Sequence, residues 1–326
     1  MTTANAGTPA LLIEGLTKRY GDVEALRGID VRVERGEVFG FLGPNGAGKS
    51  TTIRLILDLI RPTAGRIAVF GVDCQRAAVE ARRSIGYLPS DPTYPNGMTA
   101  AEVFAYAAAV RRQPLDRPYV DGLVRRLQLD PTRHVRDLSR GNRQKVGLIQ
   151  ALSTRAPLLI LDEPTTGLDP LVQEEVEGIL RDVAAEGRTV FFSSHILAEV
   201  EAICSRATIL RGGLVVDTFD LAEQRRLAPL RVEVILDRPL EDGATATLPA
   251  SVRLLEHEGA RLVFESHDEG MDGLVKWLAR YHVERLISRE PTLEDLFIRY
   301  YHAQDGAQDG PEGPPPVLAA TERGAS

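Results

Sequence analysis

The chain has 326 residues with an ordinary globular composition, 43% hydrophobic and 26% charged, and its 46 acidic and 39 basic side chains give a formal net charge of −7. The acidic balance argues against a broad nucleic-acid-binding surface, two cysteines cannot build a disulfide framework, and no run approaches the ~18–20 apolar residues of a membrane-spanning helix. We therefore expect a soluble, cytoplasmic chain without a nucleic-acid partner.

Strand-like segments rich in β-branched and aromatic residues alternate with helical segments through the first two thirds of the chain. Strands are predicted within 11–42 and at 65–73, 84–90, 158–161, 188–195, 207–213 and 214–218. Helices are predicted at 48–60, within 99–129, from 139, at 170–186 and at 196–204. Several strands are uninterrupted apolar runs, which is typical of a largely parallel, buried sheet between helices. This part of the chain is therefore predicted to have an α/β fold.

The composition changes after residue 218. Residues 219–230 are predicted to form a linking helix, and 231–302 a small α+β domain with its own apolar residues and no catalytic constellation. The tail, 303–326, is rich in Gly, Pro and Ala without periodicity, and we expect it to be disordered. The predicted organisation is thus a core at 1–218, a linker, a small domain and a tail.

The first motif that carries chemistry follows a predicted strand and opens a predicted helix. It fits the phosphate-binding pattern G-x-x-x-x-G-K-[ST], in which glycines let backbone N–H groups converge on phosphates and the helix N-terminus adds a favourable dipole. Lys49 would reach the β- and γ-phosphates of ATP, and the Ser50 hydroxyl can bind Mg²⁺. A glycine-rich turn without a ligand is the alternative, which the neighbouring strand and helix disfavour. The predicted ATP-binding residues in this segment are Gly43, Pro44, Asn45, Gly46, Ala47, Gly48, Lys49, Ser50 and Thr51.

A second predicted site lies at the end of the apolar strand 158–161, where Asp162 and Glu163 follow directly. Beside a phosphate-binding loop of the kind predicted at 43–50 (a P-loop), the first carboxylate of such a pair binds Mg²⁺ through water. The second polarises the water that attacks the γ-phosphate. A buried strand that runs into an acidic loop is the alternative, and the P-loop favours the catalytic interpretation. We therefore predict Asp162 as a metal-site residue and Glu163 as a catalytic residue.

The segment 138–145 narrows the class of P-loop protein. Its sequence, LSRGNRQK, matches L-S-x-G-x-x-Q, and here the chain resembles the ATP-binding subunit of ABC transporters. The resemblance spans about residues 9–218 and implies a P-loop NTPase core of ABC type, a mixed sheet with a helical subdomain at about 91–157. It also implies that Ser139 and Gly141 contact the γ-phosphate bound by a second subunit. Without the other motifs, Ser139 would be an ordinary helix N-cap.

Three further features fall where the resemblance implies them. Tyr20 looks like the aromatic residue that stacks on adenine, and His195, at a predicted strand end, looks like the catalytic histidine that contacts the γ-phosphate. The segment 166–169, which ends in Asp169, looks like the loop that contacts the other subunit and its ATP. Two residues depart from the family pattern: Arg140 replaces the second Gly of the signature, and Ser90 stands where the family usually has a metal-sensing Gln. The latter departure puts Ser90 in doubt as a metal-site residue.

The resemblance implies an ATPase that works as a homodimer. One chain carries one P-loop and one signature segment (138–145), so a complete ATP site needs a second copy of the chain. Two chains would enclose two ATP molecules with Mg²⁺ between them, and hydrolysis would let the closed dimer open. The motifs are similar to those of the ABC-2 class of exporters, the drug and antibiotic efflux type. This implies a separate membrane permease and a location at the cytoplasmic face of the membrane. The residues expected in a groove for the permease, or else in the core, are Pro92, Tyr94, Pro95, Phe104 and Tyr106.

Two other functions fit parts of the sequence. A soluble ABC ATPase that acts on nucleic acid or ribosomes would usually carry a coiled-coil insertion or a second ATPase core, and this acidic sequence shows neither. A regulatory module that binds ATP without turnover is consistent with Ser90, but Lys49, Asp162, Glu163 and His195 all favour an active site. ATP hydrolysis by the wild type and by Glu163→Gln discriminates between these functions. The small C-terminal domain is expected to stabilise the dimer or to regulate it.

Overall fold

The computed structural model describes residues 7–95, 97–227, 229–240 and 243–289. Its contacts divide the chain into two compact units, Met1–Ala228 and Pro229–Ser326. The boundary between them falls inside 219–230, the segment predicted to link two domains. Each unit has its own cluster of buried apolar residues and is described by itself.

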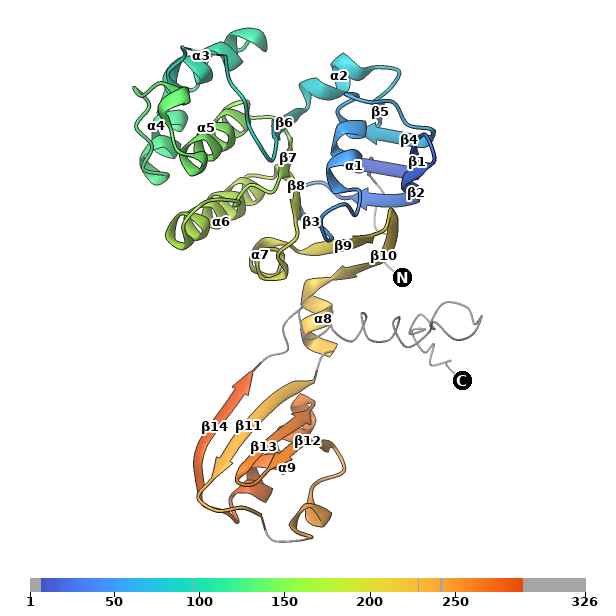
Figure 1. Ribbon diagram of the computed structural model, residues 1–326, viewed down its shortest axis with the longest axis vertical. Coiled ribbons are helices and arrows are strands. Elements are labelled where there is room, and N and C mark those ends of the chain that lie inside the picture. Colours follow the sequence, from blue (N-terminus) through green and yellow to red (C-terminus); the bar gives the residue numbers. More distant parts are fainter. Residues whose placement is uncertain (1–6, 96, 228, 241–242, 290–326) are drawn as a thin grey trace. The chain divides into compact units, whose positions relative to one another are not determined.

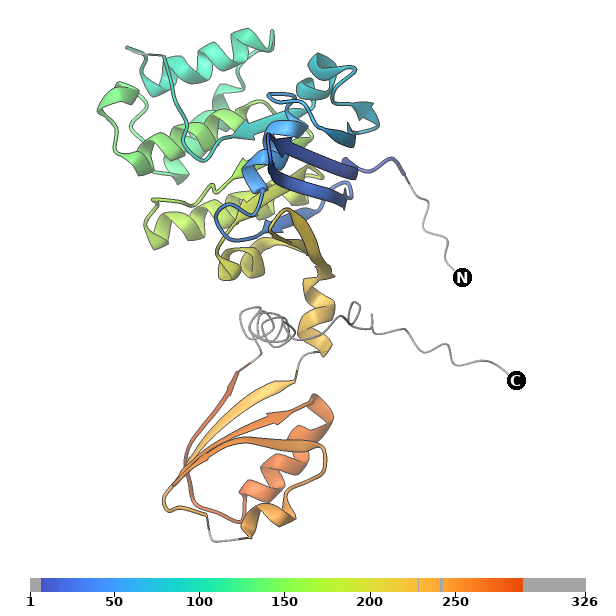
Figure 2. The same ribbon diagram turned by 45° about the vertical axis from the view of Figure 1, so that its right-hand side comes forward.

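The first unit contains a sheet with the strand order β10-β9-β3-β8-β7-β6 (Figure 1 and Figure 2). Its strands are β3 (Val38–Leu42), β6 (Ile85–Leu88), β7 (Leu158–Asp162), β8 (Thr189–Ser194), β9 (Arg206–Arg211) and β10 (Leu214–Asp220). Neighbouring strands are parallel, except that β10 runs antiparallel to β9. Strands β3, β7 and β8 are buried along their whole length. The predicted largely parallel, buried sheet is confirmed.

A second sheet in this unit is antiparallel, with the order β2-β1-β4-β5. Its strands are β1 (Leu11–Tyr20), β2 (Val23–Val33), β4 (Ala64–Val69) and β5 (Val72–Asp73). Helix α1 (Lys49–Ile56) lies between the two sheets, and its Ile53 and Leu55 share one buried cluster with residues of both. The helix is shorter than the predicted 48–60, because Asp58 adopts a left-handed backbone conformation, with φ of 55°, just after its end.

Helices α6 (Pro170–Ala185) and α7 (Leu197–Ile203) pack on β3 and β8 of the larger sheet. A group of helices packs beside β6 and consists of α3 (Ala100–Val110), α4 (Arg117–Arg126), a 3-10 turn at Val135–Asp137, and α5 (Arg140–Ser153). Helix α3 begins with a capping box, in which Glu102 N donates to Thr99 Oγ1 (3.3 Å) and Thr99 N donates to Glu102 Oε2 (2.7 Å). The unit also contains α8 (Leu221–Leu227) and α2 (Ala78–Arg83), a short helix that the sequence did not predict.

The second unit is a four-stranded antiparallel sheet, in the order β12-β13-β11-β14, with one helix in its described residues. The elements are β11 (Leu230–Leu236), a 3-10 turn at Ala244–Thr247, β12 (Val252–Glu258), β13 (Arg261–Ser266), α9 (Asp268–Leu278) and β14 (Val283–Arg289). Trp277 on α9 is buried against the sheet, with its ring centroid 5.8 Å from that of Phe264 and 4.9 Å from that of Tyr281. Residues 290–302 of the predicted domain, and the predicted tail, lie outside the described residues. Among those described, no helix is both long and apolar enough to cross a membrane.

Candidate active site

The phosphate-binding segment connects the end of β3 to the start of α1. Gly48 precedes the helix with φ of 112°, a backbone conformation that side chains rarely adopt. A Cβ atom there would lie 2.7 Å from Leu26 Cδ2, and one on Gly43 would lie 2.3 Å from Leu210 O. Glycine is therefore required at both positions for the loop to lie this close to its neighbours. No side chain caps the N-terminus of α1, which suits an anionic ligand at that end.

Lys49 lies over this loop with its ammonium group among backbone carbonyls. Its Nζ donates to Gly43 O (2.6 Å) and to Pro44 O (3.3 Å), and the residue is only 5% exposed. Burial lowers the pKa of Lys49 from its ordinary value of 10.5, whereas the charges of Glu163 and Asp162 act in the opposite direction. The loop thus holds a cation at the position that the motif assigns to phosphate binding.

Strand β7 ends in Asp162, Glu163 follows directly, and Ser193 of β8 is hydrogen-bonded to the side chain of the first and the backbone of the second. Ser193 Oγ donates to Asp162 Oδ1 (2.6 Å), and Glu163 N donates to Ser193 Oγ (3.2 Å) and to Ser193 O (3.1 Å). Glu163 has φ of 51°, which is uncommon for a residue other than glycine and is typical of backbone strain at functional sites. Its carbonyl oxygen accepts from Gln144 Nε2 (3.1 Å). These hydrogen bonds fix the strained residue at the strand end.

The side chains of three predicted residues meet at one oxygen atom. Glu163 Oε1 lies 3.2 Å from His195 Nδ1 and 3.8 Å from Lys49 Nζ. The other carboxylate oxygen, Oε2, accepts from Thr166 Oγ1 (3.3 Å). The P-loop, the end of β7 and the residue after β8 therefore contribute to a single cluster. A cation, a carboxylate and an imidazole in this arrangement suit the binding and hydrolysis of a phosphate ester.

Two other predicted residues cap helices. Ser139 is the N-cap of α5, where its Oγ accepts from Asn142 N (3.3 Å). Asp169 is the N-cap of α6, where its Oδ1 accepts from Val172 N (3.1 Å). Both side chains thus have a structural task in their own chain, which the sequence alternative for Ser139 anticipated.

Helix α5, which begins within the segment 138–145 that matches L-S-x-G-x-x-Q, packs closely against the loop that follows Glu163. A Cβ atom on Gly141 would lie 2.7 Å from Gly167 O, so the two segments lie this close only because residue 141 is glycine. Gln144, one turn further along α5, donates to the Glu163 carbonyl. The segment with Gly141 and the loop with Gly167 therefore form one packed surface that includes the backbone of Glu163.

Tyr20 and Ser90 are two further predicted site residues that make no hydrogen bond with Lys49, Glu163 or His195 among the described residues. Tyr20 is exposed at the end of β1, and Lys18 Nζ lies 4.9 Å from the centroid of its ring. Ser90 is half-buried just beyond β6. Within the described residues, no hydrogen bond joins Ser90 to Asp162 or Glu163.

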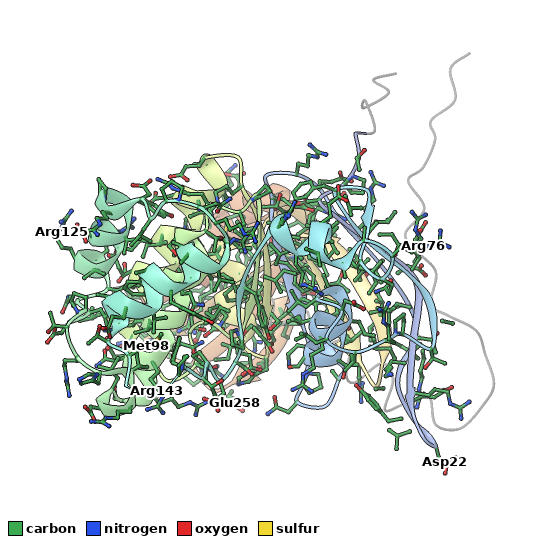
Figure 3. All side chains as sticks on the ribbon, turned by 90° about the horizontal axis from the view of Figure 1, so that it is seen from above. Asp22, Arg76, Met98, Arg125, Arg143 and Glu258 are labelled. Atoms are coloured by element: carbon green, nitrogen blue, oxygen red, sulfur yellow. The ribbon has the colours of Figure 1, made fainter. Side chains whose placement is uncertain are left out.

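The aromatic residues proposed for a groove divide between core and surface. Tyr94 packs on α5, where its hydroxyl donates to the carbonyl of Arg143 (3.2 Å), a residue labelled in Figure 3. Phe104 is buried in the core, and Tyr106 is 51% exposed. Of these three, only Tyr106 lines the pocket described next.

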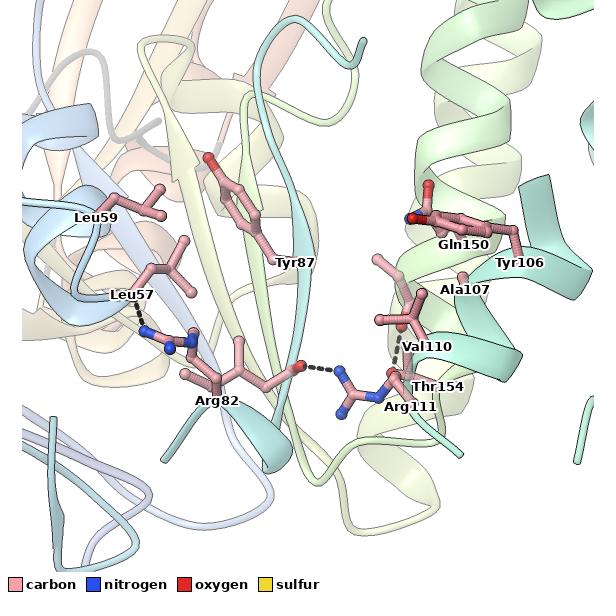
Figure 4. A pocket seen from close by; sticks show the side chains of 12 residues that line it. Leu57, Leu59, Arg82, Tyr87, Tyr106, Ala107, Val110, Arg111, Gln150 and Thr154 are labelled. Atoms are coloured by element: carbon pink, nitrogen blue, oxygen red, sulfur yellow. Dashed lines mark hydrogen bonds between the residues drawn. The ribbon is translucent and has the colours of Figure 1, made fainter. Parts of the chain in front are cut away.

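A pocket of about 430 Å³ opens between the end of α1, β6, α3 and α5 (Figure 4). Its apolar walls include Leu57, Leu59, Ile85, Tyr87, Tyr106 and Val110. Two arginine side chains are hydrogen-bonded to backbone carbonyls of residues that line the pocket. Arg82 donates to Leu57 O (3.0 Å), and Arg111 donates to Ile85 O (3.0 Å). Leu59 and Val110 are 61% and 64% exposed at its rim.

The hydrogen bonds of Ser193 and Gln144 at this site were not predicted from the sequence. Asp162 and Ser193 are partners in the parallel register of β7 and β8, so their contact depends on a strand pairing that no motif specifies. Gln144 was visible as the last position of L-S-x-G-x-x-Q. Its spacing alone could not show that it reaches the Glu163 carbonyl.

This fold and this site define an ATP-binding cassette. The sequence profile of the family described as "ABC transporter" matches residues 26–166. The chain is 35% identical over 302 residues to "Daunorubicin resistance ATP-binding protein DrrA3" of Streptomyces coeruleorubidus, which covers 89% of this chain and 95% of that protein. It is 30% identical over 301 residues to "Bacitracin transport ATP-binding protein BcrA" of Bacillus licheniformis, with 87% and 94% covered. The chain therefore belongs to the ATP-binding proteins of ABC transporters, and it is an ATPase, as the motifs predict.

Solved structures agree with this assignment. The structure of an ATP-binding subunit of an ABC transporter is 32% identical, with a TM-score of 0.62 over 67% of this chain and 92% of that chain. A dimeric ATP-binding cassette in a post-hydrolysis state, bound to ADP and Pi, has a TM-score of 0.59 at 23% identity, over 65% of this chain and 98% of that one. The second likeness shows the fold alone. The predicted ABC-type core with a mixed sheet is confirmed.

Proposed function

We propose that this chain is the ATP-hydrolysing subunit of an exporter for drug- or antibiotic-like compounds, acting as a homodimer with a separate permease at the cytoplasmic face of the membrane. The observation that carries the proposal is the meeting of Lys49 and His195 at Glu163 Oε1 beside the P-loop. The names of the relatives for daunorubicin resistance and bacitracin transport support the class of cargo. Those similarities cover 89% and 87% of the chain, so they extend beyond the ATPase core.

In the proposed site, the P-loop backbone and Lys49 bind the β- and γ-phosphates, and Tyr20 offers its exposed ring to adenine. Ser50 and Asp162 supply hydroxyl and carboxylate oxygens, the ligands that Mg²⁺ prefers, so the residues fit this ion. Mg²⁺ bound there would neutralise charge on the phosphates. The Ser193 hydrogen bond would orient Asp162 toward that task, as partners of metal-site residues commonly do.

Glu163 is the proposed general base. It orients a water molecule and accepts its proton while the water oxygen bonds to the γ-phosphorus and the bond from that phosphorus to ADP breaks. Lys49 balances the negative charge of the transferred group, and His195 donates a hydrogen bond to it. The hydrogen bonds from Ser193 and Gln144 keep the base in place, which matters because small displacements cost much of the rate.

The proposed dimer completes each nucleotide site with residues of the other chain. Ser139 and Gly141 would contact the γ-phosphate held by the partner's P-loop, and Asp169 would contact the dimer interface. The tight approach of Gly141 to Gly167 supports this proposal, because it places both segments on one packed surface. ATP would then favour the closed dimer over separate chains, and hydrolysis would reverse that preference.

The first test is trapping of the dimer by a variant that binds ATP without hydrolysing it. Glu163→Gln should lower turnover by roughly 10²-fold or more and elute as a dimer in size-exclusion chromatography with ATP. Glu174→Gln, an exposed position on α6, is the charge-matched control and should behave as wild type. Unchanged turnover in Glu163→Gln, or a monomer in the presence of ATP, would contradict the proposal.

The apolar pocket of Figure 4 is the proposed docking site for the permease. Its exposed rim residues Leu59 and Val110 would be covered by an apolar helix of that partner. Leu59→Glu and Val110→Glu should abolish drug efflux from cells that also express the permease, while ATP affinity of the purified chain stays unchanged. Leu214→Glu, at an exposed leucine of β10, serves as the control. Full efflux with both pocket variants would place the permease elsewhere.

A further inference from the structure

A buried carboxylate on α7 joins the two segments that carry the catalytic-site residues. Glu199 is 9% exposed, and its Oε1 accepts from Thr165 Oγ1 (2.6 Å) while its Oε2 accepts from Ser194 Oγ (2.5 Å). Thr165 lies two residues after Glu163, and Ser194 lies immediately before His195. One side chain thus connects the loop after β7 with the last residue of β8, next to His195.

The direction of these hydrogen bonds requires a group that only accepts. Ser194 Oγ accepts from Ile196 N (2.9 Å), and of the two acceptors near its own proton, Glu199 Oε2 (2.5 Å) is much closer than Ile196 O (3.4 Å). Thr165 and Ser194 are each 1% exposed, so water does not compete for either hydroxyl. Hydrogen bonds from buried hydroxyls to a charged acceptor are among the stronger ones in proteins, and leaving such a donor unpaired is costly.

We infer that Glu199 is a positioning residue for ATP hydrolysis, one that holds the Glu163 loop and the His195 turn at the separation at which His195 Nδ1 meets Glu163 Oε1. The inference rests on the proposed catalytic functions of Glu163 and His195. Neither hydrogen bond of Glu199 reaches the P-loop, so ATP binding does not depend on it. Glu199 acts through the distance between two other side chains and not through contact with the nucleotide.

Near-isosteric substitutions of the full-length chain test this. Glu199→Gln presents an amide N–H₂ group to one of the two hydroxyls, and Thr165→Val removes one hydroxyl while it keeps the shape. Each should lower kcat by roughly 10- to 100-fold, with KM for ATP within about threefold of wild type. Thr165→Ser keeps the hydroxyl and should retain wild-type kcat, and Glu174→Gln controls for loss of a negative charge. Unchanged kcat in Glu199→Gln and Thr165→Val, or an equal rise of KM with full kcat, overturns the inference.

A second measurement separates positioning from loss of stability. If Glu199 acts through His195, adding Glu199→Gln to His195→Ala should slow hydrolysis by less than about threefold more, because the alignment is already lost. A full further loss of 10- to 100-fold in the double variant would overturn the inference. Should Glu199→Gln fail to fold in a thermal unfolding assay, Thr165→Val against Thr165→Ser decides the question. Wild-type turnover in Glu163→Gln and His195→Ala would instead refute the proposed function itself.

Discussion

Lys49 Nζ lies 3.8 Å from Glu163 Oε1, so an ion pair joins the phosphate-binding loop to the carboxylate that follows β7. The two side chains are 5% and 20% exposed, and salt therefore screens their attraction less than it would on the surface. In the proposed site, the same ammonium group would bind the γ-phosphate of ATP. Nucleotide binding would then redistribute this ion pair and so couple occupation of the P-loop to the state of the proposed general base.

Removal of the Lys49 ammonium group should abolish ATP hydrolysis. Lys49→Met keeps much of the side-chain volume but removes the charge that faces the β- and γ-phosphates, so we expect hydrolysis at background level and ATP affinity lower by roughly tenfold or more. Turnover assays and calorimetric titration with ATP measure the two effects. Lys276→Met, at an exposed lysine of the second unit, is the matched control. Retained turnover in Lys49→Met would mean that the P-loop acts without its lysine.

The same lysine should impose a pH dependence on folding stability. Burial lowers the pKa of Lys49 in the folded chain below its ordinary value of 10.5. At any pH between the lowered pKa and 10.5, the unfolded chain therefore binds more protons than the folded chain. The free energy of unfolding should therefore rise with pH across this window, relative to that of Lys49→Met, which has no such group. Urea unfolding of both proteins at about pH 8 and about pH 10 measures the difference. A difference that shrinks as the pH rises would show that the carboxylates outweigh burial.

Much of the site was predictable because its residues are contiguous or stand at strand ends. The P-loop is one segment, Asp162 and Glu163 follow an apolar run, and His195 ends another, so their meeting follows from a parallel sheet. The contacts of Ser193 and Glu199 were not predictable in this way. They depend on strand register and on the side to which α7 turns, which are set by packing and not by any local pattern.

The fold shows the same division. The larger sheet follows from alternating apolar strands and helices. The order of the antiparallel sheet depends also on the pairing of β1 with β4, which lies more than one element further along the chain. Helix α1 ends at Ile56 and not near Ile60, because Asp58 takes a left-handed conformation. Asp at such a position is allowed but not required, so the apolar pattern alone extended the helix too far.

Gly141→Ala should impair hydrolysis, although alanine is the better helix former. The added Cβ would lie 2.7 Å from Gly167 O, so the signature segment or the facing loop must move. We expect the chain to lose ATP-dependent dimerisation and most of its turnover, with ATP binding to the monomer retained. In Gly122→Ala, on α4, the Cβ meets no atom within 4 Å, and the variant should gain about 0.5–1 kcal/mol of stability with normal turnover. Wild-type dimerisation of Gly141→Ala would show that this approach is not needed.

Restoring the family's usual residue at position 90 should change coupling more than ATP affinity. Leu88 of β6 pairs with Leu161 of the parallel strand β7, so residue 90 follows β6 at the same end of the sheet at which Asp162 ends β7. Ser90→Gln lengthens the side chain toward Asp162 and Glu163, and we expect a higher ratio of cargo transported to ATP hydrolysed. Inverted membrane vesicles that contain the permease measure both rates, with Asp91→Gln as the neighbouring control. An unchanged ratio would show that Ser90 does not limit coupling.

Trp277 should be the main contributor to the stability of the second unit. Its ring is buried between Phe264 and Tyr281, and its Nε1 donates to Thr247 Oγ1 (3.0 Å). Trp277→Ala should lower the free energy of unfolding of this unit by about 3–5 kcal/mol, whereas Trp277→Phe, which keeps a ring, should cost less. Because the chain contains one tryptophan, wild-type fluorescence reports on this unit alone, and circular dichroism follows the variants. Equal unfolding of Trp277→Ala and wild type would mean that the aromatic cluster contributes little, and the stability would then come from the backbone pairing of β11 with β13 and β14.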